Sequence, residues 1–252
     1  MGVFMKITFI GTSHGIMEKD RYCSCTVVTV NGKHYVIDAG APVADLFIRN
    51  GFNYEDIAGI FITHTHADHM MGLTTLTQTI NEFPNHFSNV SFPVYVPDLK
   101  RYRDMFSFIN GYPEFTGPVT YIKYKAGVIF DDGVVKVKAI PTKHFENSHS
   151  FILEAEGKKI GFSGDLHYDL IDYPVDFVSS EKQFDLVVME AAHQGYNENY
   201  VYDVLSKTNT KKMIINHIYE VKNPLNVLAE FGKKISDKFE FSVSYDGLVI
   251  DL

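Results

Sequence analysis

Three imidazoles and one carboxylate fall within six consecutive residues of this chain, 64–69, which read His-Thr-His-Ala-Asp-His. The apolar residues 57–62 before them predict a buried strand, so His64 and His66, two apart on its extended exit, can point the same way. The last two ligands fall where the chain turns into a predicted helix at 70–80. Imidazole and carboxylate groups suit zinc, manganese or iron. Four such ligands in one run, together with further ligands from other segments, exceed what one tetrahedral ion needs. We therefore expect two metal ions.

Apolar runs separated by turn signals predict strands along most of the chain. The expected strands are 4–10, 25–30, 33–38, 57–63, 134–140, 151–154, 159–163, 186–189, 213–216, 239–243 and 248–251, and the expected helices are 42–50, 70–80, 99–109, 199–205 and 225–235. This order predicts an α/β fold, a four-layer αββα sandwich in which helices flank two mixed β-sheets. Because no linker rich in Ser, Pro or charge interrupts the pattern, we expect one domain over residues 1–252.

Three more potential ligands, His144, Asp165 and His217, each follow a predicted strand. The carboxyl ends of strands open on a common crevice, where side chains from distant segments can meet. Asp165 is a short carboxylate behind a glycine, which suits a ligand shared by two cations. These residues complete the set that the run at 64–69 begins.

Net charge and cysteine content limit the possible binding partners and the cellular compartment. The formal net charge of −8 gives no general attraction to a phosphate backbone, so extended nucleic acid is disfavoured as a partner. A disulfide between Cys23 and Cys25 would be strained, so both are expected as reduced thiols. The first residues lack the regions of a signal peptide, and no run approaches the ~18 apolar residues that a membrane span needs. We expect a cytoplasmic protein without a membrane partner.

The ordered ligand set resembles the metallo-β-lactamase superfamily. The matching motifs are His64-x-His66-x-Asp68-His69, His144, Gly164-Asp165 and His217, with Phe9-Ile10-Gly11-Thr12 and Ile37-Asp38-Ala39-Gly40 near the start and Tyr245-Asp246-Gly247 near the end. The resemblance covers nearly the whole chain and implies the fold of that superfamily. A homodimer is a further expectation at the level of the family.

The resemblance also implies a role for each ligand. One metal would be held by His64, His66 and His144, the other by Asp68, His69 and His217, with Asp165 as the bridge. The ions would be two divalent cations, zinc first, with manganese or iron as alternatives. The nucleophile would be a hydroxide between them, which Asp68 would also orient. Position 66 is His, where the superfamily's di-iron oxygen reductases have Glu, which favours hydrolysis.

Two segments are similar to ribonuclease Z and related phosphodiesterases. Residues 144–151 resemble a His-x-x-x-Ser-x-Gly-Tyr segment of that branch, and residues 185–192 resemble its Asp-x-x-x-x-Glu-Ala-Thr stretch. Only 21 positions separate His144 from Asp165 (165 − 144), too few for the arm with which ribonuclease Z grips tRNA. The His-Ser-Thr segment of that branch is also missing. We therefore expect a small or cyclic phosphodiester as substrate.

Other polar residues are candidates for supporting roles. His193, three residues after Glu190, can hold a phosphate oxygen or protonate the leaving group, with a merely supporting or surface position as the alternative. Glu190 would orient His193 or His217. Asp38 would support a ligand or fix its own turn, and His14, in a glycine-containing loop, would reach substrate or be a plain loop residue.

The leading hypothesis is a dinuclear metal-dependent hydrolase of a small or cyclic phosphodiester. Two other enzyme classes stay open: a hydrolase of lactones, thioesters or carboxylic esters, and an RNA-processing nuclease. A metal-loaded binding or sensing protein without turnover is the non-enzymatic alternative.

Overall fold

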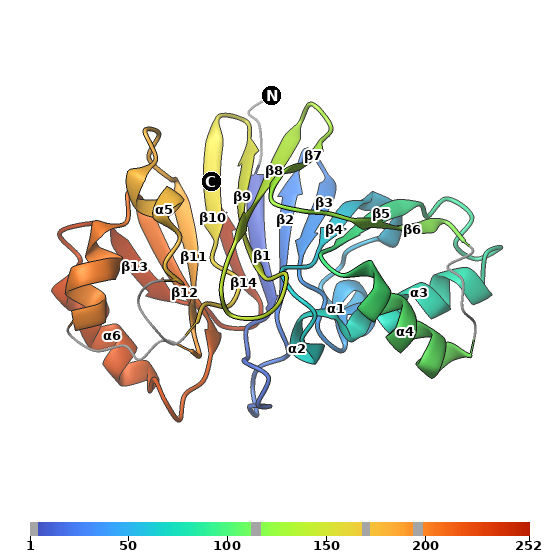
Figure 1. Ribbon diagram of the computed structural model, residues 1–252, viewed down its shortest axis with the longest axis horizontal. Helices are drawn as coiled ribbons and strands as arrows, with labels where there is room; N and C mark the ends of the chain where they lie inside the picture. The colour runs from blue at the N-terminus through green and yellow to red at the C-terminus, as the bar shows by residue number, and fades with distance from the viewer. Residues whose placement is uncertain (1–4, 112–116, 168–171, 194–198) are drawn as a thin grey trace. The chain divides into compact units, whose positions relative to one another are not determined.

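The computed structural model describes residues 5–111, 117–167, 172–193 and 199–252, which belong to two compact units (Figure 1). The first unit is Met1–Lys125 with Asp246–Leu252, and the second is Ala126–Tyr245. Each unit contains one seven-stranded sheet. The expectation of a single domain over 1–252 stays a prediction.

The sheet of the first unit has the strand order β14-β1-β2-β3-β4-β5-β6. Its strands are β1 (Met5–Gly11), β2 (Cys25–Val30), β3 (Lys33–Ile37), β4 (Ile57–Phe61), β5 (Phe92–Val96), β6 (Val119–Lys123) and β14 (Leu248–Asp251). Pairing is antiparallel from β14 to β3 and parallel from β3 to β6. The turn Asn31-Gly32 joins β2 to β3, and both of its residues have positive φ (51° and 82°), as tight hairpin turns require.

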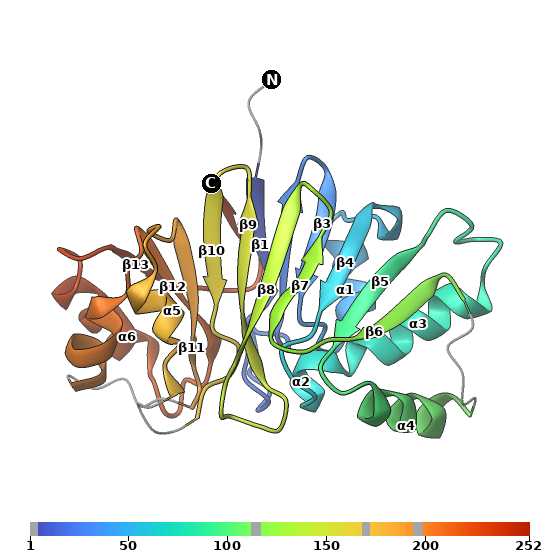
Figure 2. The ribbon, with the colours of Figure 1, turned by 45° about the horizontal axis from the view of Figure 1, so that its top comes forward.

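Helices of the first unit pack their apolar side chains against this sheet. They are α1 (Val43–Arg49), η1 (Tyr54–Asp56), α2 (Ala67–Met70), α3 (Gly72–Glu82) and α4 (Leu99–Asn110). In α3 the buried Leu73, Leu76 and Ile80 recur at helical spacing and join a core that includes Val94 of β5. Figure 2 shows α3 and α4 beside β5 and β6.

The sheet of the second unit repeats the same pairing scheme, with the order β13-β12-β11-β10-β9-β8-β7. Its strands are β7 (Gly127–Asp131), β8 (Val135–Pro141), β9 (His149–Ala155), β10 (Lys158–Phe162), β11 (Leu186–Ala191), β12 (Lys212–Ile218) and β13 (Glu240–Val243). Pairing is antiparallel from β7 to β10 and parallel from β10 to β13. The helical elements are α5 (Val175–Ser179), η3 (Tyr200–Val204), η4 (Leu205–Lys207) and α6 (Leu225–Lys234). Phe177, Phe184, Met213 and Leu228 lie in their shared core.

Among the described residues, all eleven predicted strands are present, with ends shifted by two residues or fewer, but the strands β5, β6 and β7 and the helix α5 were not predicted. Strand β5 contains Pro93, which reads as a strand breaker. Strands β6 and β7 lie at sheet edges and are largely exposed, so they lack a clear apolar period. The predicted helix 199–205 is a π-helical turn followed by a 3₁₀ turn. Within the described ranges, no helix has both the length and the apolar character that a membrane crossing needs.

Candidate metal centre

The exit of β4 carries the ligand run of the first unit. His64 and His69 are buried, and the centroids of their rings lie 4.1 Å apart. Nε2 of His64 lies 3.0 Å from Nδ1 of His66, and Nε2 of His69 lies 3.4 Å from a carboxylate oxygen of Asp68. Donor atoms at such separations can share a proton or face a common cation. The structure therefore brings together the four ligands predicted from this run.

The helix after the run differs from the predicted single helix at 70–80. It is broken into α2 and α3 at Met71, and α2 already contains Asp68 and His69. At the break the N–H of Gly72 donates to the carbonyl of Ala39 at 3.0 Å, and a Cβ on Gly72 would lie 2.6 Å from the carbonyl oxygen of Gly40. This close approach fixes the ligand run against the exit of β3.

Asp38 supports the ligand run from the end of β3, where its backbone has a φ of 59°. Its buried carboxylate accepts hydrogen bonds from the N–H of Thr63 at 2.8 Å and from the hydroxyl of Thr63 at 2.9 Å. The second carboxylate oxygen lies 2.8 Å from Nδ1 of His69. A proton on Nδ1 then leaves Nε2 of His69 as the metal donor, an arrangement typical of metal-binding histidines. Asp38 thus contacts a predicted ligand, the first of its two expected roles.

Thr63 was missed by sequence reasoning. Its hydroxyl lies 3.1 Å from Nδ1 of His64 and 3.4 Å from Nδ1 of His69, in addition to its contacts with Asp38. One buried hydroxyl therefore touches two predicted ligands and the carboxylate behind them. The sequence did offer one sign of this role, because Thr63 is a polar residue between an apolar strand and the ligand run.

The loop after β1 approaches Asp68. A Cβ on Gly15 would lie 3.3 Å from the carboxyl carbon of Asp68, so this backbone lies directly over the carboxylate. Asp246 holds the loop, because its carboxylate accepts the hydroxyl of Thr12 at 2.6 Å and the N–H of Tyr22 at 2.6 Å. His14 precedes Gly15, and its Nδ1 accepts the N–H of Ile16 at 3.2 Å. Its proposed contact with substrate stays a prediction.

The second unit gathers a second cluster around Asp165, which is only 3% exposed. Nε2 of His217 lies 3.1 Å from its carboxylate, Nε2 of His144 lies at 3.6 Å and Nδ1 of His193 lies at 3.7 Å. Asp165, His193 and His217 each offer a ligand atom within 4.8 Å of the others. The structure therefore brings the three distant ligands predicted in this unit together with His193.

His217 lies inside β12, whereas the sequence places it after the strand end. Glu190 of β11 pairs with Asn216, but the next residue, Ala191, pairs with Ile218. His217 is therefore the extra residue of a β-bulge, and its φ of 53° lies in the left-handed region. Such a bulge can redirect one side chain while the strand continues.

Glu190 fixes the turn that carries His193. Its carboxylate accepts the N–H of Ala192 at 2.6 Å and the N–H of His193 at 2.9 Å, and it lies 3.6 Å from Nδ1 of His193. The N–H of Glu190 in turn donates to the hydroxyl of Ser163, two residues before Asp165. Lys222, another residue that sequence reasoning missed, donates from its ammonium group to the carbonyl of His193 and so brings a positive charge beside the cluster.

Three further side chains, His149, Cys23 and Cys25, are of types that can bind metal but have no assigned ligand role. Burial lowers the pKa of His149, and its Nδ1 lies 2.8 Å from the carbonyl oxygen of Asn147. Cys23 and Cys25 are free thiols, as predicted. Burial, followed by the Asp68 carboxylate, raises the pKa of the Cys23 thiol, which keeps it protonated.

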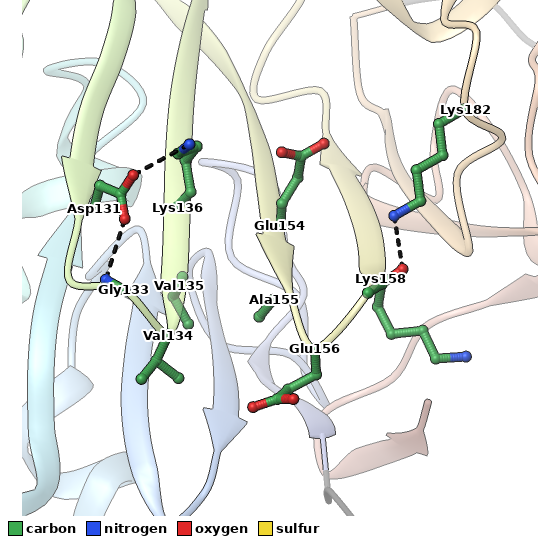
Figure 3. A pocket seen from close by; sticks show the side chains of 11 residues that line it. Asp131, Gly133, Val134, Val135, Lys136, Glu154, Ala155, Glu156, Lys158 and Lys182 are labelled. Atoms are coloured by element: carbon green, nitrogen blue, oxygen red, sulfur yellow. Dashed lines mark hydrogen bonds and ion pairs between the residues drawn. The ribbon is translucent and has the colours of Figure 1, made fainter.

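A cavity of about 330 Å³ in the second unit lies away from the ligand cluster. The turns β7–β8 and β9–β10 line it, at the opposite end of β8 and β10 from His144 and Asp165. Figure 3 shows Asp131 bound to Lys136 and to the N–H of Gly133, so much of its charge is already paired. The lining of this cavity contains neither histidine nor cysteine.

Sequence comparison finds one family model and several ribonucleases that are similar to parts of this chain. A family model described as anti-Pycsar protein Apyc1 matches residues 5–98. Ribonuclease BN of Escherichia coli O7:K1 is 27% identical over 165 residues, which are 61% of this chain and 51% of that protein. Ribonuclease Z of Synechococcus sp. is 27% identical over 147 residues, which are 56% of this chain and 45% of that protein. The chain thus spans about half the length of these curated relatives.

Structural comparison extends over the whole chain. The metallo-β-lactamase fold protein YhfI from Bacillus subtilis matches with a TM-score of 0.75 and 15% identity, covering 99% of this chain and 100% of that protein. A diphosphatase of the PhnP family matches with a TM-score of 0.71 and 18% identity, covering 99% and 97%. Human tRNase Z, short form, matches with a TM-score of 0.69 and 19% identity, covering 97% and 98%. The chain has the metallo-β-lactamase fold, which confirms the predicted fold class and the resemblance to ribonuclease Z-like proteins.

Proposed function

We propose that this chain, which has the metallo-β-lactamase fold, is a metal-dependent hydrolase of small or cyclic phosphodiesters. The observation that carries the proposal is the pair of clusters, each of which gathers imidazoles and a carboxylate, most of them buried. Imidazole and carboxylate suit zinc, manganese or iron, and a buried carboxylate needs a cation or hydrogen-bond donors to be stable. We assign His64, His66 and His144 to one ion, Asp68, His69 and His217 to the other, and Asp165 to both.

The chemistry follows from the charge of the ions and the support around their ligands. When bound, two cations would lower the pKa of a water in the site and stabilise negative charge on phosphoryl oxygens. Asp38 and Thr63 hold His69 and His64 in place, and Asp68 orients the attacking oxygen. His193, whose backbone is fixed by Glu190, protonates the departing alkoxide or holds a phosphate oxygen.

Three features favour a small phosphodiester. The sequence relatives named ribonuclease BN and ribonuclease Z carry phosphodiester cleavage in their names, and a structural neighbour is named a diphosphatase. Lys222 brings a positive charge beside His193, where an anionic substrate would benefit. The stretch from His144 to Asp165 is occupied by β9, β10 and their turns, which leaves no segment for a tRNA-gripping arm there. The homodimer and the cytoplasmic location stay predictions.

The test is a substrate panel run on the zinc-, manganese- and iron-loaded protein. We expect hydrolysis of bis-p-nitrophenyl phosphate and of at least one purine or pyrimidine 3′,5′-cyclic nucleotide, because neither needs a long binding arm. Lactones, thioesters and a precursor-tRNA trailer should turn over far more slowly. Turnover of lactones or thioesters alone, cleavage of the trailer as the preferred reaction, or no turnover despite bound metal would each contradict the proposal.

A further inference from the structure

We propose that Asp172 is a positioning residue, which holds the two ligand-bearing loops of the second unit and thereby sets the geometry of His144 and Asp165. This inference rests on the proposed function, because it concerns the metal ligands assigned there. Asp172 itself lies outside the ligand set and outside both similarity segments that the sequence revealed.

The carboxylate of Asp172 binds both loops at once. One oxygen accepts the N–H of Lys143 at 2.7 Å, and the other accepts the N–H of His167 at 2.6 Å. Lys143 directly precedes His144, and His167 follows Asp165 by two residues. Rotating or separating either loop would break one of these bonds, so the carboxylate fixes the two ligands relative to each other.

Neighbouring contacts make this clamp rigid. Asp172 is 6% exposed, and the next residue, Tyr173, packs in the core of the second unit with Phe177 and Phe184. The hydroxyl of Tyr173 contacts the hydroxyl of Thr208. A second link joins the two loops directly, because the hydroxyl of Thr142 donates to the carbonyl of Asp165 at 3.2 Å.

A carboxylate is the side chain that this place requires. Two acceptor oxygens point to two N–H groups on different segments, whereas asparagine offers one oxygen and would turn an N–H₂ group toward the other donor. Burial raises the pKa of Asp172, and the N–H groups of His167 and Lys143 oppose that rise. A carboxyl group at this depth therefore serves the two backbone donors that hold the ligand loops.

Asp132 offers a matched control in the same unit. Its carboxylate also accepts two backbone N–H groups, from Val134 at 2.9 Å and Val135 at 2.7 Å. These bonds belong to the β7–β8 turn, at the opposite end of β8 from His144. Asp132→Ala thus removes two backbone hydrogen bonds to one oxygen of an exposed carboxylate, without touching a ligand loop.

The experiment compares Asp172→Asn, Asp172→Ala and Asp132→Ala with the wild-type chain. Zinc affinity is measured by competition with a chromophoric chelator, ligand geometry by the visible absorption of the cobalt form, and stability by unfolding of the metal-free protein. We expect Asp172→Ala to lower the affinity of at least one zinc ion by roughly 10–100-fold and to alter the cobalt spectrum. Asp172→Asn should fall between, and Asp132→Ala should match wild type in both readouts.

The outcomes separate this inference from the proposed function. If the wild-type chain binds neither zinc nor cobalt, the proposed function fails and this inference fails with it. If wild type binds two ions and both Asp172 variants match its affinity and cobalt spectrum, the positioning role alone is overturned, whatever their stability. Should Asp172→Ala not fold, the milder Asp172→Asn variant decides by the same two readouts.

Discussion

Replacing Asp165 by alanine is expected to lower kcat/KM for bis-p-nitrophenyl phosphate by about a thousandfold or more. The Asp165 carboxylate is the buried centre of the second cluster, with His217 at 3.1 Å and His144 at 3.6 Å. Metal ions stabilise transition-state charge by several kcal/mol, and losing about 4 kcal/mol slows a reaction about a thousandfold. The measurement is steady-state turnover at saturating zinc, with folding checked by circular dichroism.

Asp176→Asn is the matched control for that variant. Asp176 is a partly exposed acidic residue on α5 of the same unit, outside the cluster. Its carboxylate pairs with the ammonium group of Lys138 at 2.8 Å. Its replacement should leave turnover within about twofold of wild type, because exposed ion pairs contribute little. An Asp165→Ala variant that keeps a tenth of wild-type turnover would contradict the assignment of Asp165.

The second large effect is expected at Asp38. Asp38→Ala removes the acceptor of the Thr63 N–H and hydroxyl and the partner of His69 Nδ1, all of them buried. Leaving these groups without an acceptor should lower the free energy of unfolding by about 3 kcal/mol. Because His69 also loses its orientation, zinc affinity should fall by roughly 10–100-fold. Denaturant unfolding of the metal-free protein and zinc titration measure the two effects.

In the Asp38→Ala variant, the effect of backbone conformation must be separated from the effect of the lost hydrogen bonds. Asp38 has a φ of 59°, which alanine adopts less readily than aspartate or asparagine. Asn31 has a similar φ of 51° in the exposed β2–β3 turn, so Asn31→Ala measures the effect of alanine at such a φ away from the predicted ligands. Equal losses of stability and unchanged zinc affinity in both alanine variants would rule out the support role of Asp38.

Sequence patterns led to the candidate ligands because metal ligation needs particular side chains near strand ends. The run at 64–69 and the residues His144, Asp165 and His217 combine donor chemistry with apolar strands that precede them. The bulge that carries His217 was not predictable, because it depends on how β12 pairs with β11. Because β12 is buried on both faces, its sequence has no alternation of apolar and polar residues that a bulge would interrupt.

The residues that support the candidate ligands were not predicted from the sequence, for a different reason. Thr63 and Asp172 act through hydrogen bonds whose partners are set by the folded chain, and for Asp172 both partners are backbone groups. Backbone N–H groups are present at every residue except proline, so sequence spacing gives no sign of which ones a carboxylate will bind. Such residues become visible only when the loops that they join are placed in space.

Native mass spectrometry of the zinc-loaded chain tests most directly whether the two units supply ligands to shared ions. We predict two zinc ions for wild type and one for each of His69→Ala and His217→Ala, which come from different units. Because both residues are assigned to the same ion, the double variant should also keep one. A double variant with no zinc, or a single variant that retains two, would contradict the account.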